Sequence, residues 1–244
     1  MIGILIIVLV ALGIIVLIVH IIKTKEEEEH HEQIQSVTSL DRGTWSERDL
    51  IFKLLNECGI DKRAIYHDLY IRKENGTYTQ IDLAVPTPQG IIVFEVKDYS
   101  GWIFGNGNSK YWMQILAYGQ EKHQFYNPIW QNRKHINAIR KLMPNNQGVP
   151  FFNIVVFYGD SEFKDLNYDA TGRVRVIYST QVADVIKDIK SLPSAEYGNK
   201  REVADVLAEG VHNGCDPEIR QAQINLAVRA KANSHELHTY SRRF

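Results

Sequence analysis

An acid and a base, Glu95 and Lys97, interrupt an apolar stretch that is typical of a buried β-strand. Residues 90–94 carry no charge, and the preceding apolar stretch at residues 81–85 carries only Asp82. Because side chains alternate along a strand, Glu95 and Lys97 are expected on one face of a sheet, with Asp82 beside them on the neighbouring strand. Two adjacent carboxylates repel each other and are costly to remove from water.

A divalent cation between Asp82 and Glu95 would remove this repulsion. Mg²⁺ prefers oxygen ligands and commonly takes one or two protein carboxylates, leaving positions for water and substrate phosphate, and Mn²⁺ favours the same ligands. Lys97 on the same face could contact a phosphate or help to deprotonate an attacking water. These residue types favour metal-assisted hydrolysis of a phosphodiester. The alternative, a structural ion pair at a solvated strand end, stays open at this point.

The elements that must position these residues are indicated by periodicity and turn residues. The expected elements are a helix at residues 44–59, a β-hairpin around Asn75-Gly76, a turn at residues 86–90, a second hairpin at residues 101–118, a helix entered at Asn127-Pro128, strands at residues 151–159 and 173–178, and a helix capped by Ser179 or Thr180. This order predicts an α/β fold, a mixed β-sheet flanked by helices. Alternation also places Ile81, Leu83 and Val85 together on the face opposite to Asp82.

The first part of the chain is different, because residues 2–22 are apolar apart from His20. A helix of this length spans about 31 Å, which matches the hydrocarbon core of a bilayer. A cleaved signal peptide would end in small residues, which are lacking before Lys23. We therefore expect one N-terminal transmembrane helix. Lys23 and Lys25 follow it, and no basic residue precedes it, which predicts a single-pass protein whose C-terminal part is cytoplasmic.

Three segments together resemble the nuclease-related domain (NERD) family of the PD-(D/E)xK nuclease superfamily: "QIDLAV", "FEVK" and "NPIWQN". The resemblance covers residues 43–178. It implies a restriction-endonuclease-like fold with Mg²⁺-dependent nuclease activity, DNA as the expected substrate and RNA as the alternative. It makes Asp82 and Glu95 metal ligands and Lys97 catalytic. It departs from the superfamily pattern at Ile81, where the name-giving proline would stand.

Two further residues enter through this resemblance. The family's opening helix resembles "GTWSERDL" and carries a glutamate, here Glu47, which would serve as an outer metal ligand. The Asn-Pro-x-x-Gln stretch points to Gln131, which would contact the catalytic water or a phosphate. Their ordinary alternatives are an exposed acid in a first helical turn and a helix-surface amide. Composition and the resemblance together predict this organisation: anchor 1–23, charged linker 24–40, nuclease-like domain 41–190 and helical extension 191–244.

Basic residues around the second predicted helix could hold a phosphate backbone. The candidates are Lys110, Arg133, Lys134, Arg140 and Lys141. A solvated helix face is the competing interpretation, and a formal net charge of −1 neither demands nor excludes nucleic acid. Two rival functions also stay open. One is a membrane-tethered nucleic-acid-binding module that does not cleave, and the other is a structural or partner-recruiting membrane protein.

Overall fold

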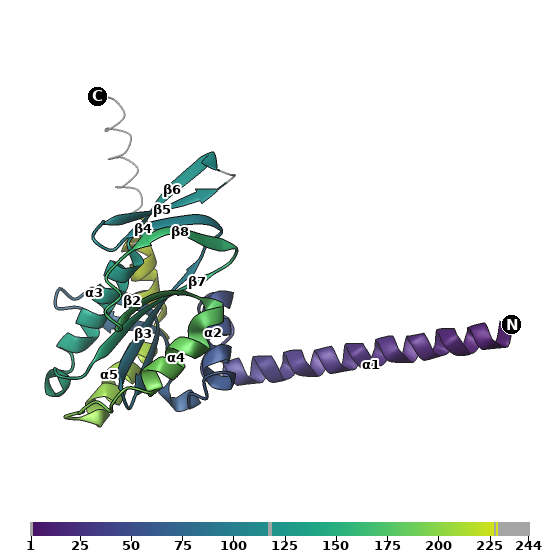
Figure 1. The fold of residues 1–244 in the computed structure, drawn as a ribbon. Coiled ribbons are helices and arrows are strands. Elements are labelled where there is room, and N and C mark those ends of the chain that lie inside the picture. The colour runs from purple at the N-terminus through teal and green to yellow at the C-terminus, as the bar shows by residue number, and fades with distance from the viewer. Residues whose placement is uncertain (1, 117–118, 227, 229–244) are drawn as a thin grey trace.

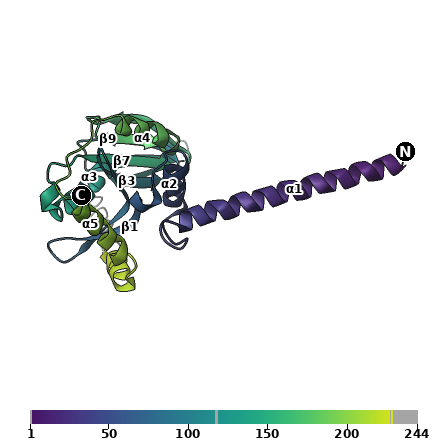
Figure 2. The same cartoon turned by 90° about the horizontal axis from the view of Figure 1, so that it is seen from below.

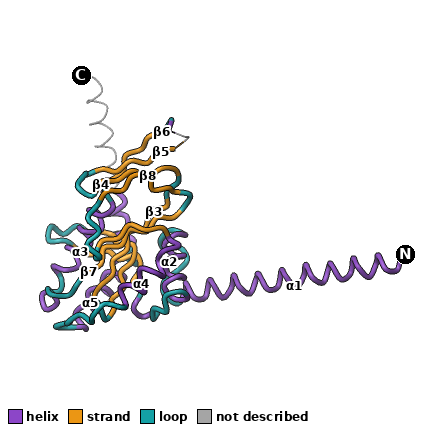
Figure 3. The backbone as a smooth tube through the Cα atoms, viewed as in Figure 1, coloured by secondary structure: helices purple, strands orange, loops and turns teal. Residues whose placement is uncertain are grey.

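A computed structural model describes residues 2–116, 119–226 and 228, with the side chains of residues 2–11 excepted. The last part of the helical extension expected at residues 191–244 lies outside these residues. The described part contains two mixed β-sheets, one above the other, and helices that cover the larger sheet (Figures 1 and 3). This arrangement fits the restriction-endonuclease-like architecture expected from the sequence.

The larger sheet has the strand order β1-β2-β3-β7-β9. Its strands are β1 (Tyr66–Arg72), β2 (Tyr78–Thr87), β3 (Gly90–Asp98), β7 (Phe151–Tyr158) and β9 (Val174–Tyr178). The first three form an antiparallel meander, and β3, β7 and β9 are parallel. The predicted hairpin around Asn75-Gly76 is confirmed, as is the turn that leads into β3.

The smaller sheet has the order β6-β5-β4-β8. Its strands are β4 (Gly101–Asn106), β5 (Tyr111–Leu116), β6 (Glu121–Tyr126) and β8 (Ser161–Asn167). The β4–β5 hairpin was expected, whereas β6 and β8 were not. Both missed strands are largely exposed and polar, so their sequences lack the apolar run by which the other strands were found.

Helices cover both faces of the larger sheet. They are α2 (Trp45–Asn56), α3 (Pro128–Lys141), α4 (Val182–Lys190) and α5 (Lys200–Asn213). Residues of α2 and α4 share one apolar cluster with β2, β3, β7 and β9, and residues of α3 and α5 share the other with β1, β2 and β3. The expected cap of α4 is wrong: Ser179 and Thr180 belong to a 3₁₀ turn, and the helix begins after Gln181.

Helix α5 packs along β1 within the predicted C-terminal extension (Figure 2). Val203 and Leu207 are buried against Leu69 and Ile71. The approach is close at Gly210, where an added Cβ would lie 2.7 Å from Ile71 Cδ1. The extension is therefore part of the packed core along the edge of the sheet.

The N-terminal helix α1 (Ile2–Gln35) projects away from the rest of the molecule (Figure 1). Among the residues described with their side chains, no helix is long and apolar enough to cross a membrane. The predicted anchor, residues 1–23, begins within residues 1–11, which lie outside that set. The anchor therefore stays a prediction.

The alternation of side chains shifts once in both β1 and β2. Ile81 packs in the cluster beside α3 and α5, whereas Leu83 packs in the cluster beside α2 and α4. The same shift occurs in β1, where Tyr66 and Leu69 are three residues apart yet pack in the same cluster beside α3 and α5. The expectation that Ile81 shares a face with Leu83 and Val85 is therefore wrong, because the strands turn over between these positions.

Candidate active site

Glu95 and Lys97 meet at the C-terminal end of β3, on the face covered by α3. Lys97 Nζ donates to Glu95 Oε1 over 2.5 Å and to Gln131 Oε1 over 3.3 Å. Glu95 is almost fully buried, and Lys97 retains 15% of its side-chain exposure. Glu95 and Lys97 thus share one face of β3, as alternation predicted, and Gln131 is a direct neighbour of the lysine rather than a free helix-surface amide.

The charges of this pair stabilise each other. Burial alone would raise the pKa of Glu95, but the ammonium of Lys97 and then the imidazole of His135 hold this pKa below its usual value. Burial alone would lower the pKa of Lys97, whereas the carboxylates of Glu95 and Asp82 raise this pKa above its usual value. Glu95 is therefore an anion and Lys97 a cation at neutral pH.

His135 is a fourth member of the group that the sequence analysis missed. It is buried, its Nδ1 lies 2.9 Å from Thr79 Oγ1, and its Nε2 lies 3.3 Å from Glu95 Oε2. The last two atoms are close but poorly aligned, and neither has a hydrogen-bond partner within the described part of the chain. Its position was readable from spacing, because residues four apart such as Gln131 and His135 share a helix face.

Buried amides fix α3 against the sheet and so position Gln131 and His135. Asn132 Nδ2 donates to the backbone oxygen of Val93 over 2.7 Å and to Asn153 Oδ1 over 2.9 Å. Asn153 Nδ2 in turn donates to the backbone oxygen of Ile129. These bonds join α3 to β3 and β7, so the helix has little freedom to slide relative to Glu95.

The start of α3 is fixed by Asn127. Its Oδ1 accepts from the backbone nitrogens of Ile129 and Trp130, and its Nδ2 donates to the backbone oxygen of Ser109 in the β4–β5 turn. Asn127 is fully buried, and Pro128 occupies the first helical turn. The "NPIWQN" segment thus ties the helix that carries Gln131 to the smaller sheet.

Asp82 reaches the site from β2, in a different way from Glu95. Its Oδ2 accepts from the backbone nitrogen of Val96 over 2.7 Å. The described pairing of β2 with β3 ends at Leu83–Phe94, one pair before Asp82 would face Glu95. The carboxylate therefore takes an amide of β3 where the backbone pairing stops.

The environment of Asp82 favours the protonated form. Burial raises the pKa of this carboxyl group, and the negative charges of Glu95 and Glu47 raise it further. Lys97 and the Val96 amide oppose this effect without cancelling it. Two carboxylates on neighbouring strands thus have opposite pKa shifts.

Glu47 is held at the start of α2 by local bonds. Its Oε1 accepts from the backbone nitrogen and hydroxyl of Thr44, which forms a capping box with it. Its Oε2 accepts from His67 Nε2 over 3.0 Å, and Thr38 Oγ1 lies 2.8 Å from His67 Nδ1. Burial alone would raise the pKa of Glu47, but His67 and Thr44 lower it. Glu47 is thus buried and bonded, not an exposed acid.

The predicted basic residues fall into two groups. Lys134 Nζ lies over the Tyr126 ring and Lys110 Nζ over the Tyr111 ring, and these two rings are paired on β5 and β6. Arg133 is exposed on the same half of α3. Toward the end of the helix, Arg140 lies over Phe151 and Lys141 pairs with exposed Glu74. Arg133 and Lys134 lie on the turns of α3 next to Gln131, about 10 Å along the helix from Arg140 and Lys141, and Lys110 directly precedes β5.

The donor set suits a divalent cation. Glu95 Oε2 is a buried oxygen without a hydrogen-bond partner among the described residues, and burial, then the negative charges of Glu95 and Glu47, raise the pKa of Asp82. Both features are what a cation between these two carboxylates would relieve. No group of three or more histidine, cysteine, aspartate or glutamate side chains in the described ranges is arranged to hold a metal ion. Among the described residues, Asp82 and Glu95 are thus the carboxylates that would hold the ion directly.

Comparison with known proteins agrees with the site motifs. Residues 42–158 match the family described as nuclease-related domain (NERD). The chain is 29% identical over 150 residues to an uncharacterized protein of Bacillus anthracis. The matched region covers 62% of this chain and 67% of that protein. No solved structure matches the chain. The chain therefore carries a nuclease-related domain at residues 42–158.

Proposed function

We propose that this domain hydrolyses phosphodiester bonds of DNA with the help of Mg²⁺. The observation that carries the proposal is that Asp82 of β2 accepts from the Val96 amide, which lies in β3 between Glu95 and Lys97, the two members of a buried ion pair. Asp82 and Glu95 would hold the ion, and Mn²⁺ would substitute for it. When bound, the ion would polarise the phosphate and lower the pKa of a water molecule.

The residues of the chain would supply binding and charge. The raised pKa of Lys97 keeps Nζ protonated, which suits stabilisation of negative charge developing on a phosphate oxygen rather than removal of a proton from water. Gln131 orients Lys97 through its Oε1 and leaves its amide nitrogen available for a phosphate or a water. Glu47 would act as an outer ligand of the ion. Its negative charge also raises the pKa of Asp82.

Nucleic acid would approach along the first half of α3. Arg133, Lys134 and Lys110 are exposed there, on the side of the helix start and the β5–β6 strands. Lysine and arginine side chains bind a phosphate backbone without reading sequence. Arg140 and Lys141 would contribute only to a longer site, because they lie at the other end of the helix.

The direct test is digestion of plasmid and linear DNA by the full chain, with Mg²⁺ and with a chelator instead. Asp82→Ala and Lys97→Ala are expected to lower the cleavage rate at least about 100-fold. Lys141→Ala, which removes an exposed lysine paired with Glu74, is the matched control and should cleave normally. Equal cleavage by all four proteins would overturn the site assignment. DNA binding that weakens with salt, without any cleavage, would favour a binding module.

The exposed apolar side chains of α1 support a second proposal, that residues 1–23 anchor the chain in a membrane. Residues 12, 14–19, 21 and 22 are apolar and about half exposed along a helix that projects from the domain (Figure 1). The test is the distribution of the full chain between membranes and supernatant after an alkaline carbonate wash. Release into the supernatant would refute the anchor and leave the nuclease proposal unaffected.

A further inference from the structure

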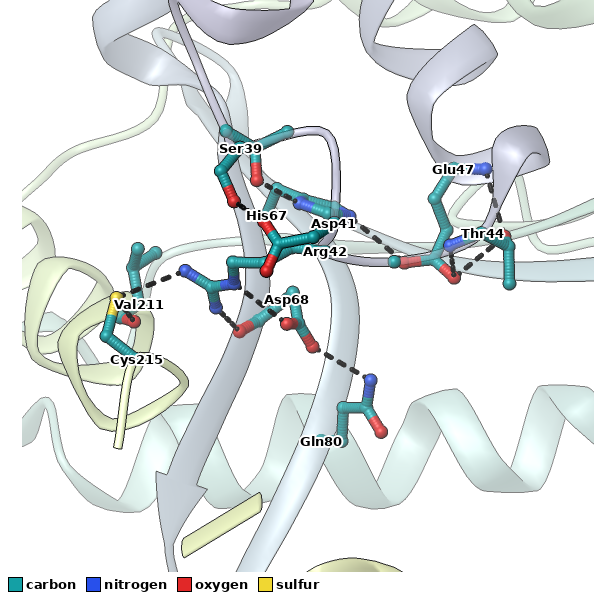
Figure 4. A network of polar contacts seen from close by, with 12 residues as sticks. Ser39, Asp41, Arg42, Thr44, Glu47, His67, Asp68, Gln80, Val211 and Cys215 are labelled. Carbon is teal, nitrogen blue, oxygen red and sulfur yellow. Dashed lines mark hydrogen bonds and ion pairs between the residues drawn. The ribbon is translucent and has the colours of Figure 1, made fainter. Parts of the chain in front are cut away.

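We infer that Arg42 and Asp68 are positioning residues that deliver the Asp82 carboxylate to β3. Neither residue touches the proposed substrate site. Both lie on the far side of β2 from Glu95, in a buried polar network that joins the α1–α2 connection, β1, β2 and the end of α5 (Figure 4). The inference deepens the proposed function, because Asp82 matters only as part of that site.

Asp68 has an unusual backbone. Among the non-glycine residues that the structure describes, it alone has a positive φ, +53°. This left-handed conformation is costly for most residues and is tolerated best by glycine, asparagine and aspartate. Strain of this kind persists only where surrounding contacts hold it.

The surrounding contacts are specific. Arg42 Nε donates to Asp68 Oδ2 over 3.0 Å, and Arg42 Nη2 donates to the backbone oxygen of Asp68 over 2.7 Å. Gln80 Nε2 donates to Asp68 Oδ1 over 2.8 Å. The side chains of Arg42 and Asp68 are less than one tenth exposed. One loop and the neighbouring strand β2 thus hold the left-handed residue through three hydrogen bonds.

The consequence appears directly across the sheet. The pairing of β1 with β2 continues on both sides of Asp68, as His67–Leu83 and Leu69–Ile81, but it is interrupted where Asp68 would face Asp82. The alternation of side chains in both strands shifts at this same place. The left-handed residue therefore makes the side chains of both strands change faces together at the position of Asp82.

The turn-over explains how Asp82 meets β3. If the β2–β3 pairing had continued past Leu83–Phe94, Ile81 would have come opposite Val96. Instead, Ile81 faces the α3 and α5 side, and the Val96 amide donates a hydrogen bond to the Asp82 carboxylate over 2.7 Å. Without the shift at Asp68, the backbone of β2 would compete for the same amide.

The test is hydrogen exchange of the full chain, read by NMR at the amides of Val96 and Phe94. The variants are Asp68→Ala, which disfavours the left-handed conformation, and Asp68→Gly, which permits it. Asp68→Ala should accelerate exchange at Val96 about tenfold relative to Phe94, and Asp68→Gly should leave this ratio close to that of the wild type. Asp61→Ala, at an exposed Asp–Arg pair, is the matched control.

A merely structural role predicts otherwise, because a general loss of stability accelerates both amides together. Equal acceleration, or an Asp68→Gly ratio as high as that of Asp68→Ala, would overturn the inference. If Asp68→Ala does not fold, Arg42→Lys gives the same readout, since lysine cannot make the two-point contact. If the domain cleaves DNA, Asp68→Ala should lower kcat and leave KM unchanged. If Asp68→Ala raises the exchange rate at Val96 relative to Phe94 but the protein never cleaves DNA, the positioning role is upheld and only the nuclease function is refuted.

Discussion

Asp82 and Glu95 are carboxylates on neighbouring strands, yet their surroundings shift the two pKa values in opposite directions. On the α3 side, Lys97 and His135 surround Glu95 and lower its pKa. On the side of β2, burial and then the charges of Glu95 and Glu47 raise the pKa of Asp82, and Lys97 opposes them only in part. The difference teaches that the charge of Glu95 is balanced by its neighbours, whereas the negative charge of an ionised Asp82 is not and would be neutralised by a cation.

The hydrogen bonds show the same contrast. Glu95 accepts a hydrogen bond from Lys97 of its own strand and lies beside His135 of α3, a helix held by buried amides. Asp82 is fixed by a backbone amide and by the distortion of its strand beside Asp68. Changes to the first region should therefore affect charge and stability, and changes to the second should affect geometry and metal binding.

The largest effect is expected from removing the cation beside Glu95. Lys97→Met leaves a buried carboxylate without its partner, which should lower the free energy of unfolding by about 3 kcal/mol and abolish cleavage. Chemical denaturation at neutral pH measures this change. Lys141→Met, at an exposed pair of similar length, should cost less than about 0.5 kcal/mol. Similar losses in both variants would remove the distinction between the two kinds of ion pair.

The next effect concerns pH, and the two acids should give opposite signs. The pKa of Asp82 is raised on folding, so its stabilising contribution is present at low pH and is lost as pH rises through the raised pKa. Asp82→Asn removes that loss, and its stability relative to the wild type should grow with rising pH. Glu95 has a lowered pKa, so Glu95→Gln should be destabilising above the usual glutamate pKa, and this deficit should vanish in acid. Unfolding curves at several pH values give both signs, and parallel curves for the two variants would contradict the comparison.

A smaller effect is expected at Glu47. Glu47→Gln keeps the capping box, because glutamine serves at that position, but it removes a negative charge that raises the pKa of Asp82. The pKa of Asp82 should fall toward its usual value, with a stability change within about 1 kcal/mol. NMR titration of the Asp82 carboxyl group measures this shift. An unchanged titration would separate Glu47 from the site.

The smallest effect is expected on DNA binding. Lys134→Ala should weaken binding and lower the dependence of log K on log salt by about one unit, as loss of one phosphate contact requires. Lys187→Ala, an exposed lysine on α4 at the other face of the sheet, is the control. Fluorescence anisotropy at several salt concentrations compares the two. An equal change in both slopes would show that binding is not directed to α3.

Much of this site could be predicted because it depends on local patterns. Alternation along β3 was enough to place Glu95 and Lys97 on one face. The family resemblance singled out Gln131, and the structure places it beside the lysine. His135 could also have been found, since it lies one helical turn after Gln131. The general architecture followed from the order of periodic segments.

What could not be predicted depends on the break in alternation. A regular period of two placed Ile81 with Leu83 on one face. The sequence around Asp68 does not indicate that this residue adopts a left-handed backbone conformation. The roles of Arg42 and His67 could not be predicted either, because each side chain contacts a partner that is many residues away in the sequence. The polar strands β6 and β8 were missed because a hydrophobic pattern is the signal that sequence analysis reads.

The sequence by itself determined which residues could do chemistry and on which elements they lie, because local periodicity and turn residues decide helix, strand and face. Only the tertiary structure decided how the two carboxylates differ. A pKa depends on every charge and every layer of protein around a group, and the conformation of Asp68 depends on Arg42 and Gln80 from other elements. These are long-range contacts, which exist only once the chain has folded.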